Sequence, residues 1–214
     1  LYRISRVTAG KQMPITLIAV SKKKPVEMIE ALRKENQKDF GENYVQELIA
    51  KAEELKAKNC TDLKWHFLGH LQRNKVKQVL PYVEAIHTVD SVALAKEIAK
   101  RWRELGKENP IEIFVQVNID QEPSKSGFAP EDVPAAVKEI AELKEIRILG
   151  LMCIPKVDRQ SKRDPFMRLR LLEKECKPYT EGYLSMGMSD DFEFALMESA
   201  THLRIGRTLF GERE

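Results

Sequence analysis

Cysteine is scarce in this sequence of 214 residues, and aromatic side chains make up only 7% of it. The three cysteines are an odd number at wide, irregular spacing, which fits neither a disulfide framework nor a zinc site. His66 and His70 lie four residues apart, but the stretch between them reads as the end of a strand rather than as one face of a helix. We therefore expect a cytoplasmic protein without a metal site.

Long hydrophobic runs and a dominant sign of charge are also lacking. The longest apolar stretches, such as Thr16–Val20 and Ile111–Ile119, are far shorter than the roughly 20 residues that a membrane-spanning helix needs. No secretory leader is visible in the sequence, which begins at Leu1. The 36 Lys and Arg residues nearly balance the 33 Asp and Glu residues, and the densest basic run, near Arg73, reads as a solvated helix face. We expect neither a membrane segment nor a nucleic-acid partner.

What the sequence does contain is a regular alternation of short apolar runs and longer amphipathic stretches, which is typical of strand–helix units around a parallel sheet. The predicted strands are Thr16–Ser21, Lys38–Gly41, Leu63–Leu68, Ala85–Val89, Ile111–Ile119, Ile146–Met152, Tyr183–Met186 and His202–Ile205. The predicted helices are one that opens at Pro25, followed by Tyr44–Lys58, Arg73–Leu80, Ser91–Leu105, Pro130–Leu143, Asp164–Cys176 and Asp190–Glu198.

These eight units, without a linker or a break in composition, predict a single domain over residues 1–214, a closed (β/α)₈ TIM-type barrel. The chain is somewhat shorter than the about 250 residues typical of that fold. An open doubly wound sheet is the main alternative, but no Gly-x-Gly-x-x-Gly follows any predicted strand. The polar loops Asp120–Gly127 and Lys156–Asp164 would then lie on the C-terminal face, where barrels bind their ligands.

Lys22 follows the first predicted strand and would face the barrel mouth. If the chain stays extended, Lys24 projects to the same side, and repulsion between the two amines lowers the pKa of one of them. A partly deprotonated lysine can form a Schiff base with an aldehyde or a ketone. A solvated basic turn is the alternative interpretation of the same residues.

The last two strand ends carry the features of a phosphate site, which barrels commonly build there. Gly187 and Gly206 allow the backbone to approach a ligand closely, and Ser189 offers a hydroxyl group close to free backbone N–H groups. Simple helix capping with tight turns would use the same residues. Together with Lys22, a phosphate site here would suit a phosphorylated aldehyde, for which pyridoxal 5′-phosphate (PLP) is the obvious candidate.

Seven groups of motifs lie in order along nearly the whole chain. They are Ala19-Val20-Ser21-Lys22 with Lys24-Pro25, Phe40-Gly41-Glu42-Asn43-Tyr44-Val45-Gln46-Glu47, Trp65-His66-Phe67-Leu68-Gly69-His70-Leu71-Gln72, Lys125-Ser126-Gly127, Gly150-Leu151-Met152, Ser185-Met186-Gly187-Met188-Ser189, and Arg204-Ile205-Gly206 with Phe210-Gly211. Through them the sequence resembles the pyridoxal phosphate homeostasis proteins, which are PLP-binding proteins similar to the N-terminal domain of alanine racemase.

The resemblance implies one barrel that binds PLP as an internal aldimine on Lys22. It implies that Ser189 and the backbone amides around Gly206 and Arg207 hold the phosphate. Position 207 is Arg where several relatives have Thr or Ser, so the backbone amide rather than the side chain is expected to bind there, with Thr208 beside it. The relatives also have a longer N-terminal helix, and residues Ile4–Gly10 are expected to be its remnant.

The resemblance further implies that Arg204 faces the pyridine nitrogen and that Asn43 lies beside the ring or its O3′ oxygen. A guanidinium does not give up a proton to that nitrogen at neutral pH, so the ring stays a weak electron sink. A racemase needs an acid or base on each face of the substrate carbon. In alanine racemase the second group is a tyrosine supplied through a C-terminal domain and dimerisation, and we expect no such domain in this chain. Tyr44 is a candidate replacement.

We therefore expect a non-catalytic protein that holds, buffers or delivers PLP to apo PLP-dependent enzymes, and that is a monomer. A PLP-dependent amino-acid racemase or lyase with a minimal site is the alternative, and a Schiff-base aldolase without PLP is a third reading. Lys24 is a candidate second amine for releasing the aldehyde. His66 and His87 are expected inside the barrel, and the side chains expected to fill the barrel are Trp65, Phe67 and Met152.

Overall fold

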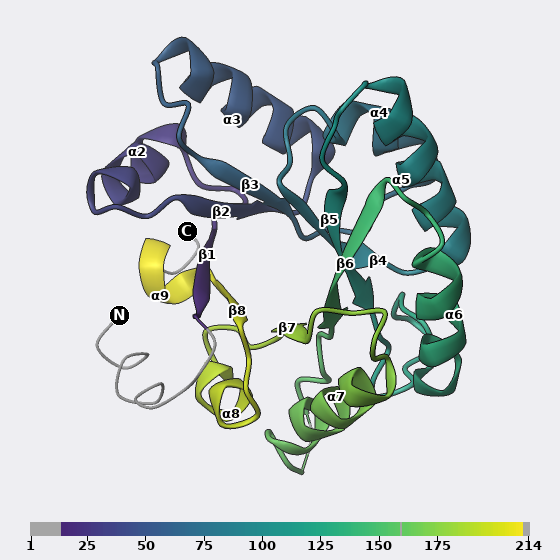
Figure 1. The fold of residues 1–214 in the computed structure, drawn as a ribbon. Coiled ribbons are helices and arrows are strands. Elements are labelled where there is room, and N and C mark those ends of the chain that lie inside the picture. Colours follow the sequence, from purple (N-terminus) through teal and green to yellow (C-terminus); the bar gives the residue numbers. More distant parts are fainter. Residues whose placement is uncertain (1–13, 159, 212–214) are drawn as a thin grey trace.

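Eight parallel strands close into a barrel in which each strand pairs with its neighbours in sequence and β8 pairs with β1. The computed structural model describes residues 14–158 and 160–211, so the predicted helix Ile4–Gly10 lies outside the described residues. Helices surround the ring of strands (Figure 1). The predicted (β/α)₈ fold is confirmed.

The strands are β1 (Thr16–Val20), β2 (Asp39–Glu42), β3 (Lys64–Phe67), β4 (Ala85–Val89), β5 (Ile111–Gln116), β6 (Ile146–Met152), β7 (Tyr183–Ser185) and β8 (His202–Ile205). The helices are α2 (Val26–Lys34), α3 (Val45–Ala57), α4 (Val76–Val79), α5 (Val92–Glu104), α6 (Val133–Ile140), α7 (Asp164–Glu175), α8 (Phe192–Met197) and α9 (Arg207–Phe210), with 3₁₀ turns at Arg73–Lys75 and Pro130–Asp132. Among the described residues, no helix combines the length and apolarity needed to cross a membrane.

The main differences from the predicted elements are at the end of β5 and directly after β8. β5 ends at Gln116 rather than at Ile119, because the chain beyond it leaves the ladder and Val117 makes an isolated bridge with Phe128. The short helix α9, which directly follows β8, was not predicted because a four-residue helix has no hydrophobic periodicity to detect.

Successive side chains along each strand point alternately into the barrel interior and outward into the layer beneath the helices. Trp65 and Phe67 belong to the large apolar cluster that the helices cover, so the prediction that they fill the barrel is wrong. The residue between them, His66, faces the interior instead, where it contacts His87. Met152 is confirmed as an interior residue and packs in a separate small cluster with Phe114 and Leu149.

Candidate functional site

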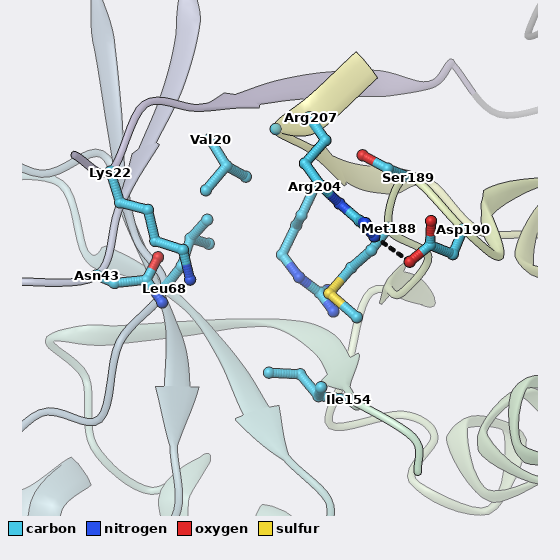
Figure 2. Close-up of a pocket in the computed structure, with 11 residues that line it drawn as sticks. Val20, Lys22, Asn43, Leu68, Ile154, Met188, Ser189, Asp190, Arg204 and Arg207 are labelled. Carbon is cyan, nitrogen blue, oxygen red and sulfur yellow. Dashed lines mark hydrogen bonds and ion pairs between the residues drawn. The ribbon is translucent and has the colours of Figure 1, made fainter. Parts of the chain in front are cut away.

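A cavity of about 620 Å³ opens at the C-terminal ends of the first and last strands. Figure 2 shows its lining side chains, which come from opposite sides of the barrel mouth. The lining residues are Val20, Lys22, Asn43, Leu68, Ile154, Met188, Ser189, Asp190, Arg204, Gly206 and Arg207. Since these residues come from the ends of β1, β2, β3, β6, β7 and β8, the closed barrel is what brings them together.

Lys22 lies in a tight turn directly after β1, and its side chain points into the cavity beside Asn43 and Leu68 (Figure 2). The turn is closed by a hydrogen bond from the Lys24 amide to the Ser21 carbonyl at 3.0 Å, and Lys23 has a φ of 58°. The prediction of an extended chain from Lys22 to Lys24 is therefore wrong. The Lys24 amine instead donates to the Phe210 carbonyl at 3.2 Å.

Arg204 lies on the opposite side of the cavity, deep in the barrel. It is on β8 next to Ile18 of β1, and its side chain is buried. Its Nη1 donates to Ser185 Oγ at 2.7 Å, and its Nη2 donates to the Cys153 carbonyl at 2.9 Å. Burial lowers the pKa of the Arg204 guanidinium. A guanidinium has five N–H donors, so these two bonds orient the group and leave donors for a ligand.

The loop after β7 and the start of α9 form the rim on the same side as Arg204. Gly187 has a φ of 94°, and a Cβ there would lie 2.7 Å from the Cβ of Ala195, so only glycine fits. The Met188 amide donates to Asp191 at 2.7 Å, which fixes the loop that carries Ser189.

Arg207 extends across this rim to an ion pair with Asp190 (Figure 2). Both side chains are exposed. The Arg207 side chain thus has a partner within the chain, while its backbone amide lies in the first turn of α9, where helix geometry provides no internal acceptor.

Asn43 follows β2, and its Oδ1 is buried without a hydrogen-bond partner among the described residues. The Asn43 carbonyl packs so closely on Gly69 that a Cβ at Gly69 would lie 1.9 Å from the oxygen. Gly69 therefore sets the distance between the loops that follow β2 and β3. A buried polar atom without a partner costs free energy, so Asn43 Oδ1 is suited to meet a donor from a ligand.

The structure brings together every residue that the sequence singled out as a cofactor contact, namely Lys22, Asn43, Ser189, Arg204, Gly206 and Arg207. Their roles toward a cofactor stay predictions. Tyr44 is 52% exposed and is not among the lining residues.

Sequence reasoning missed the other lining residues, Val20, Leu68, Ile154, Met188 and Asp190. Each lies at or just after a strand end, so position relative to the strands was the signal that could have found them. It also missed Ser185 as an acceptor for Arg204. No local pattern indicates this contact, because it joins two strands.

Comparison with known proteins gives concordant results. The family described as the alanine racemase N-terminal domain matches residues 3–214. The pyridoxal phosphate homeostasis protein of Mus musculus is 40% identical in an alignment over 210 residues that covers 92% of this chain and 77% of the relative. The protein of the same name from Pseudomonas aeruginosa is 40% identical over 202 residues, covering 94% of this chain and 85% of the relative.

Solved structures point to the same family. PipY of Synechococcus elongatus with PLP bound is 36% identical, has a TM-score of 0.85 and is matched over 97% of this chain and 100% of its own. Alanine racemase of Clostridium difficile, at 18% identity and a TM-score of 0.70, covers 99% of this chain but is matched over 56% of its own length, and shares the fold alone. The relatives carry the name of homeostasis proteins rather than of enzymes. The chain belongs to the alanine racemase N-terminal domain family and, within it, to the pyridoxal phosphate homeostasis proteins.

Proposed function

We propose that this protein binds PLP covalently through Lys22 and holds, buffers or delivers it within the cell without catalysing a reaction of its own. The observation that carries the proposal is the cavity itself, which has the Lys22 amine on one side and the Arg204 guanidinium on the other. The PLP complex of PipY, which is matched over 97% of this chain and 100% of its own, supports it.

The residues of the cavity fit the parts of PLP. Its aldehyde and its ring nitrogen lie at opposite ends of the pyridine ring, as Lys22 and Arg204 lie on opposite sides of the cavity. The orphaned Asn43 Oδ1 is suited to a hydroxyl donor on the ring. On the rim, the Ser189 hydroxyl and the first amides of α9 are suited to a phosphate.

PLP supplies a reactive aldehyde and an electron-withdrawing ring. Lys22 would be the residue that holds PLP, because its primary amine can condense with an aldehyde with loss of water. Arg204 would donate to the ring nitrogen and, because it keeps its proton, leave that nitrogen unprotonated. Such a site favours retention of the ligand over carbanion chemistry.

The lining residues also support the non-catalytic reading. Lys22 is one acid–base group at the ligand, and a racemase needs a second one on the other face of the substrate carbon. Of the remaining described lining residues, Asp190 is committed to an exposed ion pair with Arg207. Tyr44, the candidate second group, is exposed to solvent and does not line the cavity.

Delivery requires partners, and we propose apo PLP-dependent enzymes as acceptors for a monomeric carrier whose residues 1–214 act as one PLP-binding unit in the cytoplasm. A role for Lys24 as a second amine during release is tested by the rate of PLP transfer to an acceptor apo-enzyme. Transfer from Lys24→Ala at the wild-type rate would exclude that role.

The direct test is the visible absorption spectrum of the protein loaded with PLP, before and after borohydride reduction, with Lys22→Ala beside it. Borohydride converts a C=N bond into a stable amine. We expect bleaching of the visible band, and PLP retained by mass in the denatured wild-type protein but not in Lys22→Ala.

Lys24→Ala is the matched control, because it removes a neighbouring amine whose hydrogen bond goes to the Phe210 carbonyl. It should retain PLP covalently. Retention of reduced PLP by Lys22→Ala, or a wild-type protein that gains no band with PLP, would contradict the proposal.

The enzyme alternative is tested by turnover of a panel of amino acids by the loaded protein. We expect no substantial turnover. A substantial kcat that disappears in Lys22→Ala would show that the protein is a racemase or a lyase.

A further inference from the structure

A row of polar side chains crosses the barrel interior beneath the cavity. It consists of Asp39 on β2, His66 on β3, His87 on β4, Ser185 on β7 and Arg204 on β8. The last four are buried, whereas the Asp39 side chain is 27% exposed at the opposite mouth of the barrel. Buried polar groups are costly unless each has its hydrogen-bond partner, so the bonding within this row decides whether it can exist.

Consecutive hydrogen bonds join the whole row. Arg204 Nη1 lies 2.7 Å from Ser185 Oγ, which lies 2.8 Å from His87 Nδ1. His87 Nε2 lies 3.0 Å from His66 Nδ1. His66 Nε2 lies 3.0 Å from Asp39 Oδ1. The chain of contacts therefore runs without a gap from the cavity to a carboxylate at the far end of the barrel.

Because the Asp39 carboxylate only accepts, neutral histidines allow one direction along this chain. Arg204 can only donate, so Ser185 Oγ accepts from it and its own proton is free for His87 Nδ1. A nitrogen that accepts carries no proton, so the His87 proton lies on Nε2 and is donated to His66 Nδ1. By the same argument the His66 proton lies on Nε2 and is donated to Asp39, which as a carboxylate only accepts.

The surroundings agree with a neutral His87. Burial lowers its pKa well below the ordinary value, and the neighbouring His66, His202 and Arg204 act in the same direction. Since a neutral imidazole has one donor and one acceptor, each histidine in the row uses both of its nitrogens. Every member is thus satisfied only if all the bonds point the same way.

We propose that the chain Asp39–His66–His87–Ser185 is a positioning device that aims the Arg204 guanidinium at the ligand ring. The Asp39 carboxylate sets the direction of the hydrogen bonds because it can only accept. The Ser185 hydroxyl donates its proton to His87 and therefore presents a lone pair to Arg204. Four residues that do not line the cavity thereby act on the ligand through Arg204. The role toward the ring rests on the proposed binding of PLP.

The first test uses the protein without any ligand. Long-range ¹⁵N–¹H spectra of the imidazoles distinguish the two neutral tautomers and the protonated form. We expect the imidazoles of His66 and His87 to carry a proton on Nε2, and His87 to be neutral near pH 7. A protonated His87, or a proton on its Nδ1, would overturn the proposal.

The second test compares Ser185→Ala with His202→Phe, after thermal unfolding has shown that both variants are folded. Ser185→Ala removes the link between His87 and Arg204, so we expect about tenfold weaker PLP binding, a shifted absorption maximum of the bound ligand and a loss of the single His87 tautomer. His202 is also buried in the barrel, but its Nδ1 lies 3.0 Å from Thr201 Oγ1, outside the chain. His202→Phe should bind PLP within about twofold of wild type.

Unchanged binding and absorption in Ser185→Ala would overturn the positioning role, as would equal losses in both variants. If the wild-type protein bound no PLP, the proposed function would fall, and the role toward the ring with it. The ligand-free spectra would still decide the direction of the hydrogen bonds, so the two failures are distinguishable.

Discussion

Lys51 of α3 is buried beneath the turn that carries Lys22, and it holds that turn in place. Its Nζ donates to the Ser21 carbonyl, to Glu42 Oε1 and to Glu47 Oε1, each at 2.7 Å. Glu42 is fully buried, so its negative charge would cost on the order of several kcal/mol without a cation beside it.

The other side of the turn is tied to the same cluster, because Glu47 also accepts a hydrogen bond from the Lys23 amide. The residues before and after Lys22 are therefore both connected to Lys51. Lys22 is thus held through the backbone of its two neighbours, and its own side chain points into the cavity.

Replacing Lys51 with methionine should destabilise the protein by about 3 kcal/mol, because it leaves the Glu42 carboxylate buried without its cation. Burial already raises the pKa of Glu42, against the opposing effect of Lys51, and the substitution raises it further. The folded state then holds a proton that the unfolded state releases, so stability falls as the pH rises above the ordinary carboxyl pKa.

Urea unfolding of Lys51→Met between about pH 4 and pH 7 measures this effect, with a steeper fall expected than in wild type. Lys58→Met is the matched control, since Lys58 ends the same helix in exposed ion pairs with Glu30 and Glu54. Surface pairs contribute little, so its pH dependence should follow wild type. Equal slopes for both variants would contradict the role given to Lys51.

At the scale of the elements, the strands could be predicted because a buried parallel strand is a short apolar run between polar stretches. This pattern located β1 and β8, and with them the strand ends that carry Lys22 and Arg204. Apolarity does not say which face of a strand a side chain occupies, however, and Trp65 was accordingly placed on the wrong face. That choice depends on the register between strands, which pairs Trp65 with Phe40 and leaves His66 inside.

The position of a site residue was predictable where one local motif fixes it, as for Lys22 directly after β1. It was not predictable where the role needs partners far apart in the sequence. Ser185 and His87 are 98 residues apart and touch only because the barrel closes. Lys51 carried a signal that could have been used, because it occupies the buried face of α3 between Leu48 and Leu55.

Gly69 sets the distance between the loops that follow β2 and β3, and Gly69→Ala tests this role. The added Cβ meets the Asn43 carbonyl at 1.9 Å, so the loop after β2 must shift. We expect a loss of about 1–3 kcal/mol in the free energy of unfolding and weaker PLP binding.

Gly150→Ala is the control for this clash, because its Cβ would lie 1.8 Å from the Tyr183 carbonyl, on strands away from Asn43. It should lose similar stability in urea unfolding but bind PLP more tightly than Gly69→Ala. The same loss of binding in both variants would mean that Gly69 has no particular role in placing Asn43.

For the whole molecule, the notable feature is a barrel interior that is partly polar. His87 stacks on Phe114 with ring centroids 4.5 Å apart, and His202 makes edge contacts with both rings. Arg204 and Ser185 lie nearer the cavity. The fold follows from the alternation of strands and helices, but the interior is determined by which polar groups can satisfy one another there.

This interior makes the stability of the molecule sensitive to acid, and His202→Phe tests the link. Burial lowers the pKa of His202 to about 3, with His66 and Arg204 acting in the same direction and Asp39 opposing it. In the unfolded chain His202 takes up a proton near the ordinary histidine pKa of about 6.5, whereas in the folded protein it stays neutral down to about pH 3. The stability that this difference contributes is therefore full above pH 6.5 and is lost as the pH falls toward 3.

From about pH 7.5 to pH 5, this one residue should account for a loss of roughly 2 kcal/mol in the free energy of unfolding. Urea unfolding at the two pH values should therefore give a smaller loss in His202→Phe than in wild type, because phenylalanine takes up no proton in either state. A loss of the same size in both proteins would mean that His202 is already protonated, or exposed, in the folded barrel.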